Sequence, residues 1–243
     1  MATFSEIGHA KNIANFQDLI AFVESYGSIY NPSKNALKLP QLNALVTLSQ
    51  THLEEVITKN TIYNNAVNER IIEFANLKGL STRIINALET TDATKEKVNN
   101  AKTFNRKLQG KRASQPTTPA DPNALAPNTI SASQQSYDQQ IQHLGGLIAV
   151  LQTEASYTPN ETDLTIAGLT TKQANLNAKN NAVSVAYANV SNSRITRNNT
   201  LYNNETGLVQ TATEVKKYIK SIFGATSQEY AQVKGIQFKK IKM

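Results

Sequence analysis

The chain has 243 residues, of which 40% are hydrophobic and 18% charged, and its net charge is +7 at neutral pH. It contains no cysteine, which excludes disulfides, thiolate catalysis and thiolate metal sites. The 10 glycines and 7 prolines are few for a loop-rich β protein, and the 27 asparagines make much of the expected surface neutral and polar.

The first half of the chain predicts one long helix among shorter ones. A leading helix is expected at about 12–27. Apolar residues then recur at steps of three and four, which predicts a long amphipathic helix over about 36–77. Asn31 and Pro32 suit its start. Pro40 removes a backbone donor, which predicts a second start there, after a short turn at 32–38. Shorter helices are predicted at 80–89 and 94–109.

The second half predicts the same order of elements. A leading helix is expected at 137–154, and a long helix follows, with Thr158, Pro159 and Glu161 as its capping box. Tyr187 and Val190 are expected in its buried seam. A helix is predicted at 208–223 and ends at Gly224; Thr226 and Glu229 form a further capping box. For residues 235–243 the sequence is compatible with a helical, an extended or a frayed structure.

An internal repeat explains this likeness. Matching residues lie 127 positions apart, and beyond Gly79, which matches Gly207 at a distance of 128, the offset grows to 134. The seven extra residues equal two helical turns, so they lengthen a helix without turning its buried face. The matched pairs include Tyr30 with Tyr157, Leu37 with Leu164, Leu42 with Leu169, Val56 with Val183, Arg70 with Arg197, Ile20 with Leu147, and Phe104 with Phe238.

The repeat sets the predicted domain organisation. We predict a first helical unit at 1–113, a linker at 114–133 and a second helical unit at 134–243. Four prolines in the linker disfavour helix there: Pro116, Pro119, Pro122 and Pro127. The predicted fold is all-α, an elongated bundle of six to eight helices built from two tandem repeats related by pseudo-twofold symmetry.

The sequence lacks the patterns of a catalytic or cofactor site. His9, His52 and His143 are far apart in sequence, and no glycine-rich phosphate loop or nucleophile elbow is present. We therefore predict no enzyme, no metal site and no cofactor. Arg70 and Arg197 occupy matching seam positions, and two interpretations stay open: an anion site, or arginines at a solvated edge that pair with nearby glutamates, such as Glu69, Glu73 or Glu205.

Positive charge gathers in two matching regions of the repeat. Either region is a candidate contact for an anion or an acidic partner. The first comprises Lys95, Lys97, Lys102, Arg106, Lys107, Lys111 and Arg112, and the second comprises Lys216, Lys217, Lys220, Lys234, Lys239, Lys240 and Lys242.

Three hypotheses for function follow from these features. The first is a non-catalytic helical scaffold that binds a protein partner or associates with itself through its long seams. The alternative is a basic module that binds nucleic acid or an anionic membrane surface. The third is a pore-forming component that uses the apolar stretch 141–151, which at about half the length of a membrane span predicts no transmembrane helix. The N-terminal residues do not form a secretory signal, so a cytoplasmic location is predicted, with signal-independent export left open.

Three segments carry a resemblance to a known group of proteins. They are YTPNE at 157–161, RNNTLYNNETGLV at 197–209 and SIFGATS at 221–227. With them the chain resembles an uncharacterised family of tandem-repeat α-helical proteins from Bacteroidota. The resemblance implies a bacterial origin and an all-helical repeat fold, and it implies no activity and no functional residue.

Overall fold

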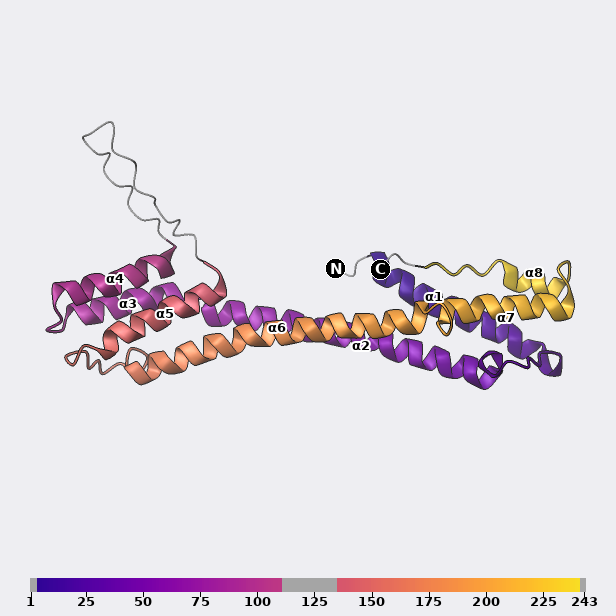
Figure 1. Ribbon diagram of the computed structural model, residues 1–243, viewed down its shortest axis with the longest axis horizontal. Coiled ribbons are helices and arrows are strands. Elements are labelled where there is room, and N and C mark those ends of the chain that lie inside the picture. Colours follow the sequence, from indigo (N-terminus) through magenta and orange to yellow (C-terminus); the bar gives the residue numbers. More distant parts are fainter. Residues whose placement is uncertain (1–3, 111–134, 241–243) are drawn as a thin grey trace, which may run out of the picture. The chain divides into compact units, whose positions relative to one another are not determined.

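A computed structural model describes residues 4–110 and 135–240, with side chains from residue 8 onward in the first range (Figure 1). These residues are helical and contain no strand, which confirms the predicted all-α bundle. The linker predicted at 114–133 lies outside them. The elements are α1 (Phe4–Ser25), η1 (Gly27–Ile29), η2 (Asn35–Leu37), α2 (Leu39–Phe74), α3 (Leu77–Glu89), α4 (Lys95–Gln109), α5 (Tyr137–Gln152), α6 (Ile166–Tyr202), α7 (Leu208–Phe223) and α8 (Gln228–Lys234).

Local signals fix several helix ends where the sequence places them. The Thr94 side chain accepts a hydrogen bond from the Lys97 N–H at the start of α4, and Gly110 ends that helix in the left-handed conformation. Helix α7 ends at Gly224, whose φ of 97° favours glycine. Helix α2 begins at Leu39, next to Pro40, after the short turn η2. Of the two starts considered for the first long helix, the structure has the later one.

Two predicted capping boxes are wrong. Helix α6 begins at Ile166, not beside Thr158, because residues 157–164 form a turn that the Tyr157 hydroxyl closes by donating to the Leu164 carbonyl at 2.9 Å. The Tyr30 hydroxyl donates to the Leu37 carbonyl at 2.8 Å in the matching turn of the first half. At α8 the N-cap is Ser227, one residue later than predicted, and its hydroxyl accepts from the Tyr230 N–H.

The chain forms two compact units whose boundaries differ from the predicted domains. Unit 1 is Met1–Tyr63 with Ala186–Met243, and unit 2 is Asn64–Val185. Unit 1 therefore combines α1 and the first part of α2 with the last part of α6, α7 and α8. Unit 2 combines the rest of α2, α3 and α4 with α5 and the first part of α6. Each compact unit draws on both halves of the sequence, whereas the predicted domains 1–113 and 134–243 separate those halves.

The core of unit 1 lies under α1 and α7. Fully buried Phe16 and Leu19 of α1 pack with Leu208 and Ile219 of α7, and Leu42 of α2 completes this cluster. In unit 2, α4 packs between α3 and α5. The close approach of α4 to α5 depends on Gly146, because a Cβ at this position would lie 2.2 Å from the Phe104 ring.

Helices α2 and α6 run antiparallel within each unit. In unit 1, His52 contacts Thr200 and Tyr63 contacts Tyr187. Residues later in α2 therefore contact residues earlier in α6. In unit 2 the pairs Glu69 with Lys179 and Glu73 with Lys172 follow the same rule. The predicted burial of Tyr187 is wrong. Its spacing in the sequence matches the buried seam of α6, but its side chain lies at the surface.

Candidate interaction surfaces

The basic side chains of α4 in unit 2 are partly engaged by acidic residues. Lys97 Nζ donates to the Thr153 carbonyl at 2.6 Å and to Glu154 at 3.0 Å, and Lys102 pairs with Glu89 at 2.5 Å. Hydrogen bonds from Ser156, and then from Lys97, lower the pKa of Glu154 to about 2. These pairs tie α4 to its neighbours and neutralise Lys97 and Lys102 within the unit.

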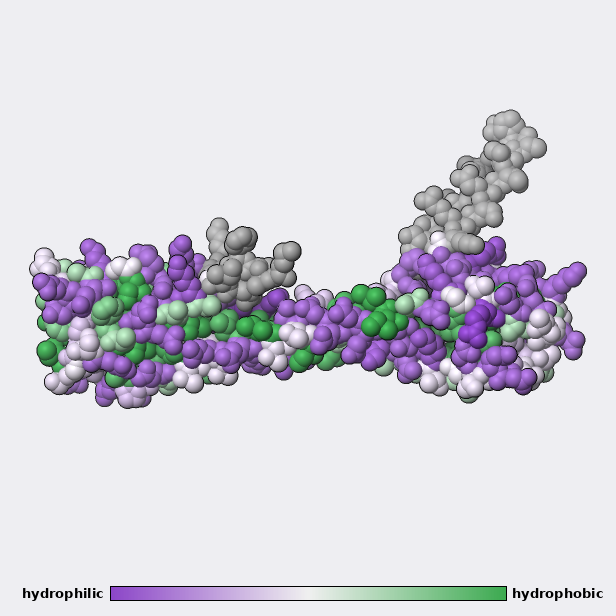
Figure 2. Space-filling model, turned by 180° about the vertical axis from the view of Figure 1, so that it is seen from behind, coloured by the Kyte–Doolittle hydropathy of each residue, from purple (hydrophilic) through white to green (hydrophobic). Residues whose placement is uncertain are grey.

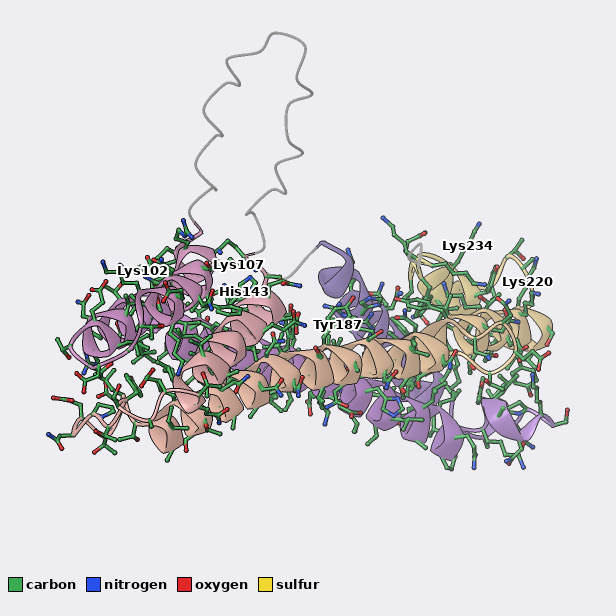
Figure 3. All side chains as sticks on the ribbon, turned by 60° about the vertical axis from the view of Figure 1, so that its left-hand side comes forward. Lys102, Lys107, His143, Tyr187, Lys220 and Lys234 are labelled. Carbon is green, nitrogen blue, oxygen red and sulfur yellow. The ribbon has the colours of Figure 1, made fainter. Side chains whose placement is uncertain are left out.

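The other basic side chains of α4 lie near the surface without an acidic partner among the described residues. Lys95 and Arg106 are exposed, and Lys107, which is labelled in Figure 3, lies 5.6 Å from the Phe104 ring. Lys111 and Arg112 lie outside the described residues. Among the described residues of this region, Lys95, Arg106 and Lys107 therefore form its free positive surface.

The second basic set lies in unit 1 and is divided between the core and the surface. Lys216 points inward: its Nζ donates to the Ile236 carbonyl and lies 5.2 Å from the Phe238 ring, and burial lowers its pKa. Lys220 lies 5.7 Å from the Tyr230 ring, and Lys240 donates to Asn204. Lys217, Lys234 and Lys239 are exposed, and Lys242 lies outside the described residues. The two predicted basic regions thus belong to different compact units.

Exposed apolar side chains on α2 and α6 are the feature that the sequence analysis missed. In unit 1, Ile57 and Ile62 of α2 are 60% and 49% exposed, and Tyr187 and Ile195 of α6 are 60% and 57% exposed. Figure 2 shows apolar residues reaching the surface along the stretch that α2 and α6 form. The three isoleucines lie off the predicted seam, and that mismatch was a signal available in the sequence.

Three of these side chains are exposed at neighbouring levels of the helix pair. The contacts of His52 with Thr200 and of Tyr63 with Tyr187 lie on either side of Ile57 along α2 and of Ile195 along α6, so the two isoleucines are at similar levels. At about 100° per residue, Tyr187 and Ile195 point about 80° apart around α6. We call these three residues the apolar face; exposed Glu54 and Arg194 lie beside it, one on each helix.

The seam arginines are held inside the protein rather than at a solvated edge. Arg70 donates to the Asn180 side-chain oxygen at 3.1 Å, and its guanidinium lies 4.0 Å above the Tyr137 ring. The glutamates expected to pair with it, Glu69 and Glu73, instead bind Lys179 and Lys172. Arg197 is buried and donates to the Asn198 side chain. Arg70 thereby links α2 to α6 and α5.

Two surface hollows in unit 2 lack converging catalytic groups. The larger, of about 350 Å³, is lined by residues of the α3–α4 turn and of 156–161, and its acidic residues are Asp92 and Glu161. The second, of about 320 Å³, contains Asp163 and Lys172, which are already paired with Arg83 and Glu73. Ser156 in the first lining donates its hydroxyl hydrogen to Glu154, but that carboxylate is already paired with Lys97, and no histidine lines either hollow.

No protein-family model, curated protein or solved structure matches the chain. Within residues 4–110 and 135–240, no helix combines the length and the apolar character needed to cross a membrane. The same residues contain no group of three or more histidine, aspartate or glutamate side chains placed to hold a metal ion.

His143 on α5 predicts a pH-dependent stability. It is 5% exposed, its Nε2 atom has no partner among the described residues, and burial and then the charge of Lys107 lower its pKa (Figure 3). The unfolded chain therefore takes up a proton below about pH 6.5 that the folded chain does not, and stability falls as the pH drops through this range. We expect His143→Phe, which introduces the residue found at the matching position 16, to reduce this loss.

Urea unfolding at pH 7 and pH 5 measures the effect. The unfolding free energy of the wild-type chain should fall more between these values than that of His143→Phe. Glu154, whose pKa is lowered to about 2, changes the unfolding free energy at a pH lower than this range. An equal fall in the two proteins would contradict the expectation.

Proposed function

We propose that the chain is a non-catalytic helical scaffold that associates with a second copy of itself through the apolar face of unit 1. The exposure of Ile57, Tyr187 and Ile195 on adjacent helices carries this proposal. Large apolar side chains exposed close together on a helix pair favour association, because covering them removes apolar surface from water.

The size of the effect is sufficient for a measurable dimer. Complete burial of a large apolar side chain contributes about 1.5–3 kcal/mol, and these three are each more than half exposed. Tyr187 also presents a rigid aromatic ring, which already packs against Tyr63 at 5.9 Å between ring centroids. Such aromatic side chains are enriched among residues that dominate binding energy.

Charge beside the apolar face favours a second copy as the partner. A twofold interface brings the same patch of both copies together, and a twofold axis parallel to the helices places α2 of one copy against α6 of the other. Exposed Glu54 lies on α2 and exposed Arg194 lies on α6. In this arrangement Glu54 of each copy faces Arg194 of the other, and this complementary charge supports pairing of the two apolar faces.

We also propose that the two halves of the chain are related by pseudo-twofold symmetry. The matching Tyr30–Leu37 and Tyr157–Leu164 hydrogen bonds support this relation. So does the composition of the units, since each takes its leading helix from one half and its trailing helices from the other.

Sedimentation equilibrium over a range of concentrations tests the proposed self-association. We expect the wild-type chain to form dimers and Ile57→Lys to weaken the dimer by at least about tenfold, because the substitution places an unpaired charge in the interface. The matched control is Ile72→Lys, which changes an isoleucine of the same helix that is 74% exposed and belongs to unit 2. A monomeric wild-type chain, or equal weakening by both substitutions, would refute the proposal.

A further inference from the structure

Residues 236–240 of unit 1 form a non-helical segment that lies along α1 and is held by its main chain. The Asn15 side-chain amide donates to the Gln237 carbonyl at 2.6 Å. Asn12 makes two bonds to Lys239: its amide donates to the carbonyl at 2.8 Å, and its oxygen accepts from the N–H at 3.1 Å. Lys216 Nζ donates to the Ile236 carbonyl. These bonds recognise backbone atoms and do not require particular side chains on the segment.

Every second side chain of the segment points toward the core of unit 1. Ile236 and Phe238 pack against the core of unit 1, while Gln237 and Lys239 are exposed. The Phe238 ring lies edge-on to Phe16, with 6.4 Å between centroids, and the Lys216 ammonium is 5.2 Å from its centre. An aromatic side chain thus has a specific place beside an apolar ring and a cation.

The matching part of unit 2 has a different structure. Phe104 matches Phe238 in the repeat, but it belongs to helix α4, whose main-chain groups bond within the helix. The positions that match Asn12 and Asn15 are Gln139 and Gln142. Only unit 1, among the described parts, combines a non-helical segment with two amide side chains one helical turn apart that bind its backbone.

We propose that this surface of α1 and α7 is a peptide-binding groove, which the chain's own residues 236–240 fill and which the same segment of a second copy fills in exchange. Four hydrogen bonds to its main chain, one from the Lys240 side chain to Asn204, and two apolar side chains hold the segment. It releases at a lower free-energy cost than unfolding of the unit, because local segments with few contacts open independently. The groove recognises an aromatic residue within a non-helical, basic peptide.

A labelled peptide with the sequence of residues 234–243 tests the proposal by fluorescence anisotropy. The full-length Phe238→Ala chain, whose aromatic site is vacated, should bind this peptide at least about tenfold more tightly than the wild-type chain does. A peptide with alanine in place of the phenylalanine, and one N-methylated at the Lys239 position, should both bind weakly. Equal binding of the N-methylated and unmodified peptides would overturn the proposal, because it would show that the backbone donor is not recognised.

A second measurement uses the wild-type chain and does not depend on how the variant folds. Excess unlabelled peptide should speed hydrogen exchange in residues 235–240, since the free peptide displaces the bound segment, and should leave α3 to α5 unchanged. The N-methylated peptide should have little effect. Unchanged exchange in residues 235–240 with excess unmodified peptide would refute exchange of the segment.

Discussion

Gly207→Ala is expected to lower the free energy of unfolding by about 2–4 kcal/mol, because the new methyl group collides with backbone atoms. A Cβ on Gly207 would lie 2.5 Å from the Asn203 nitrogen and 2.6 Å from its carbonyl oxygen. This glycine is the N-cap of α7, and its N–H donates to the same Asn203 carbonyl. The turn between α6 and α7 must therefore shift to accept alanine.

Gly79→Ala is the control, because it makes the same substitution near the start of the helix that follows the first long helix; Gly79 lies inside α3, whereas Gly207 is the N-cap of α7. A Cβ there would lie 2.7 Å from the side-chain oxygen of Asn76, which can rotate away. Alanine in a helix is favoured over glycine by up to about 1 kcal/mol, so this variant should not lose stability. Urea unfolding followed by circular dichroism compares the two. Equal losses would contradict the assignment of the Gly207 effect to the backbone collision.

The positions of the helices could be predicted from the sequence because the determining signals are local. Thr94 and Gly110 cap α4, and Gly224 ends α7, through interactions within a few residues. The start of α6 could not be predicted in this way. The Thr158–Glu161 pattern is a valid capping signal, but the Tyr157 bond to Leu164 and the burial of both residues hold the chain in a turn there.

The partition into compact units could not be predicted because periodicity identifies a buried face and not the helix that covers it. The seam of α2 extends from Leu42 to Phe74, yet its first part belongs to unit 1 and its last part to unit 2. Sequence similarity between the halves suggested one domain for each half. In the structure, the leading helix of each half packs with trailing helices of the other half.

For the candidate surfaces, too, the sequence does not identify which other elements contact a given side chain. A run of lysines is visible in the sequence, but the acids that neutralise Lys97 and Lys102 come from other elements. The inward direction of Lys216 depends on the segment that contains Ile236 and Phe238. By contrast, Ile57 and Ile195 lie off the seam in the sequence itself, so the apolar face was open to prediction.

The central claim is that each compact unit is built from both halves of the sequence, since this arrangement creates the apolar face from α2 and α6. Cleavage of the chain at a protease site introduced within residues 114–133 tests it most directly. We expect the two fragments to stay together as a 1:1 complex on size exclusion, with the helical circular dichroism and the melting temperature of the intact chain. Fragments that separate into two folded, helical monomers would contradict the claim.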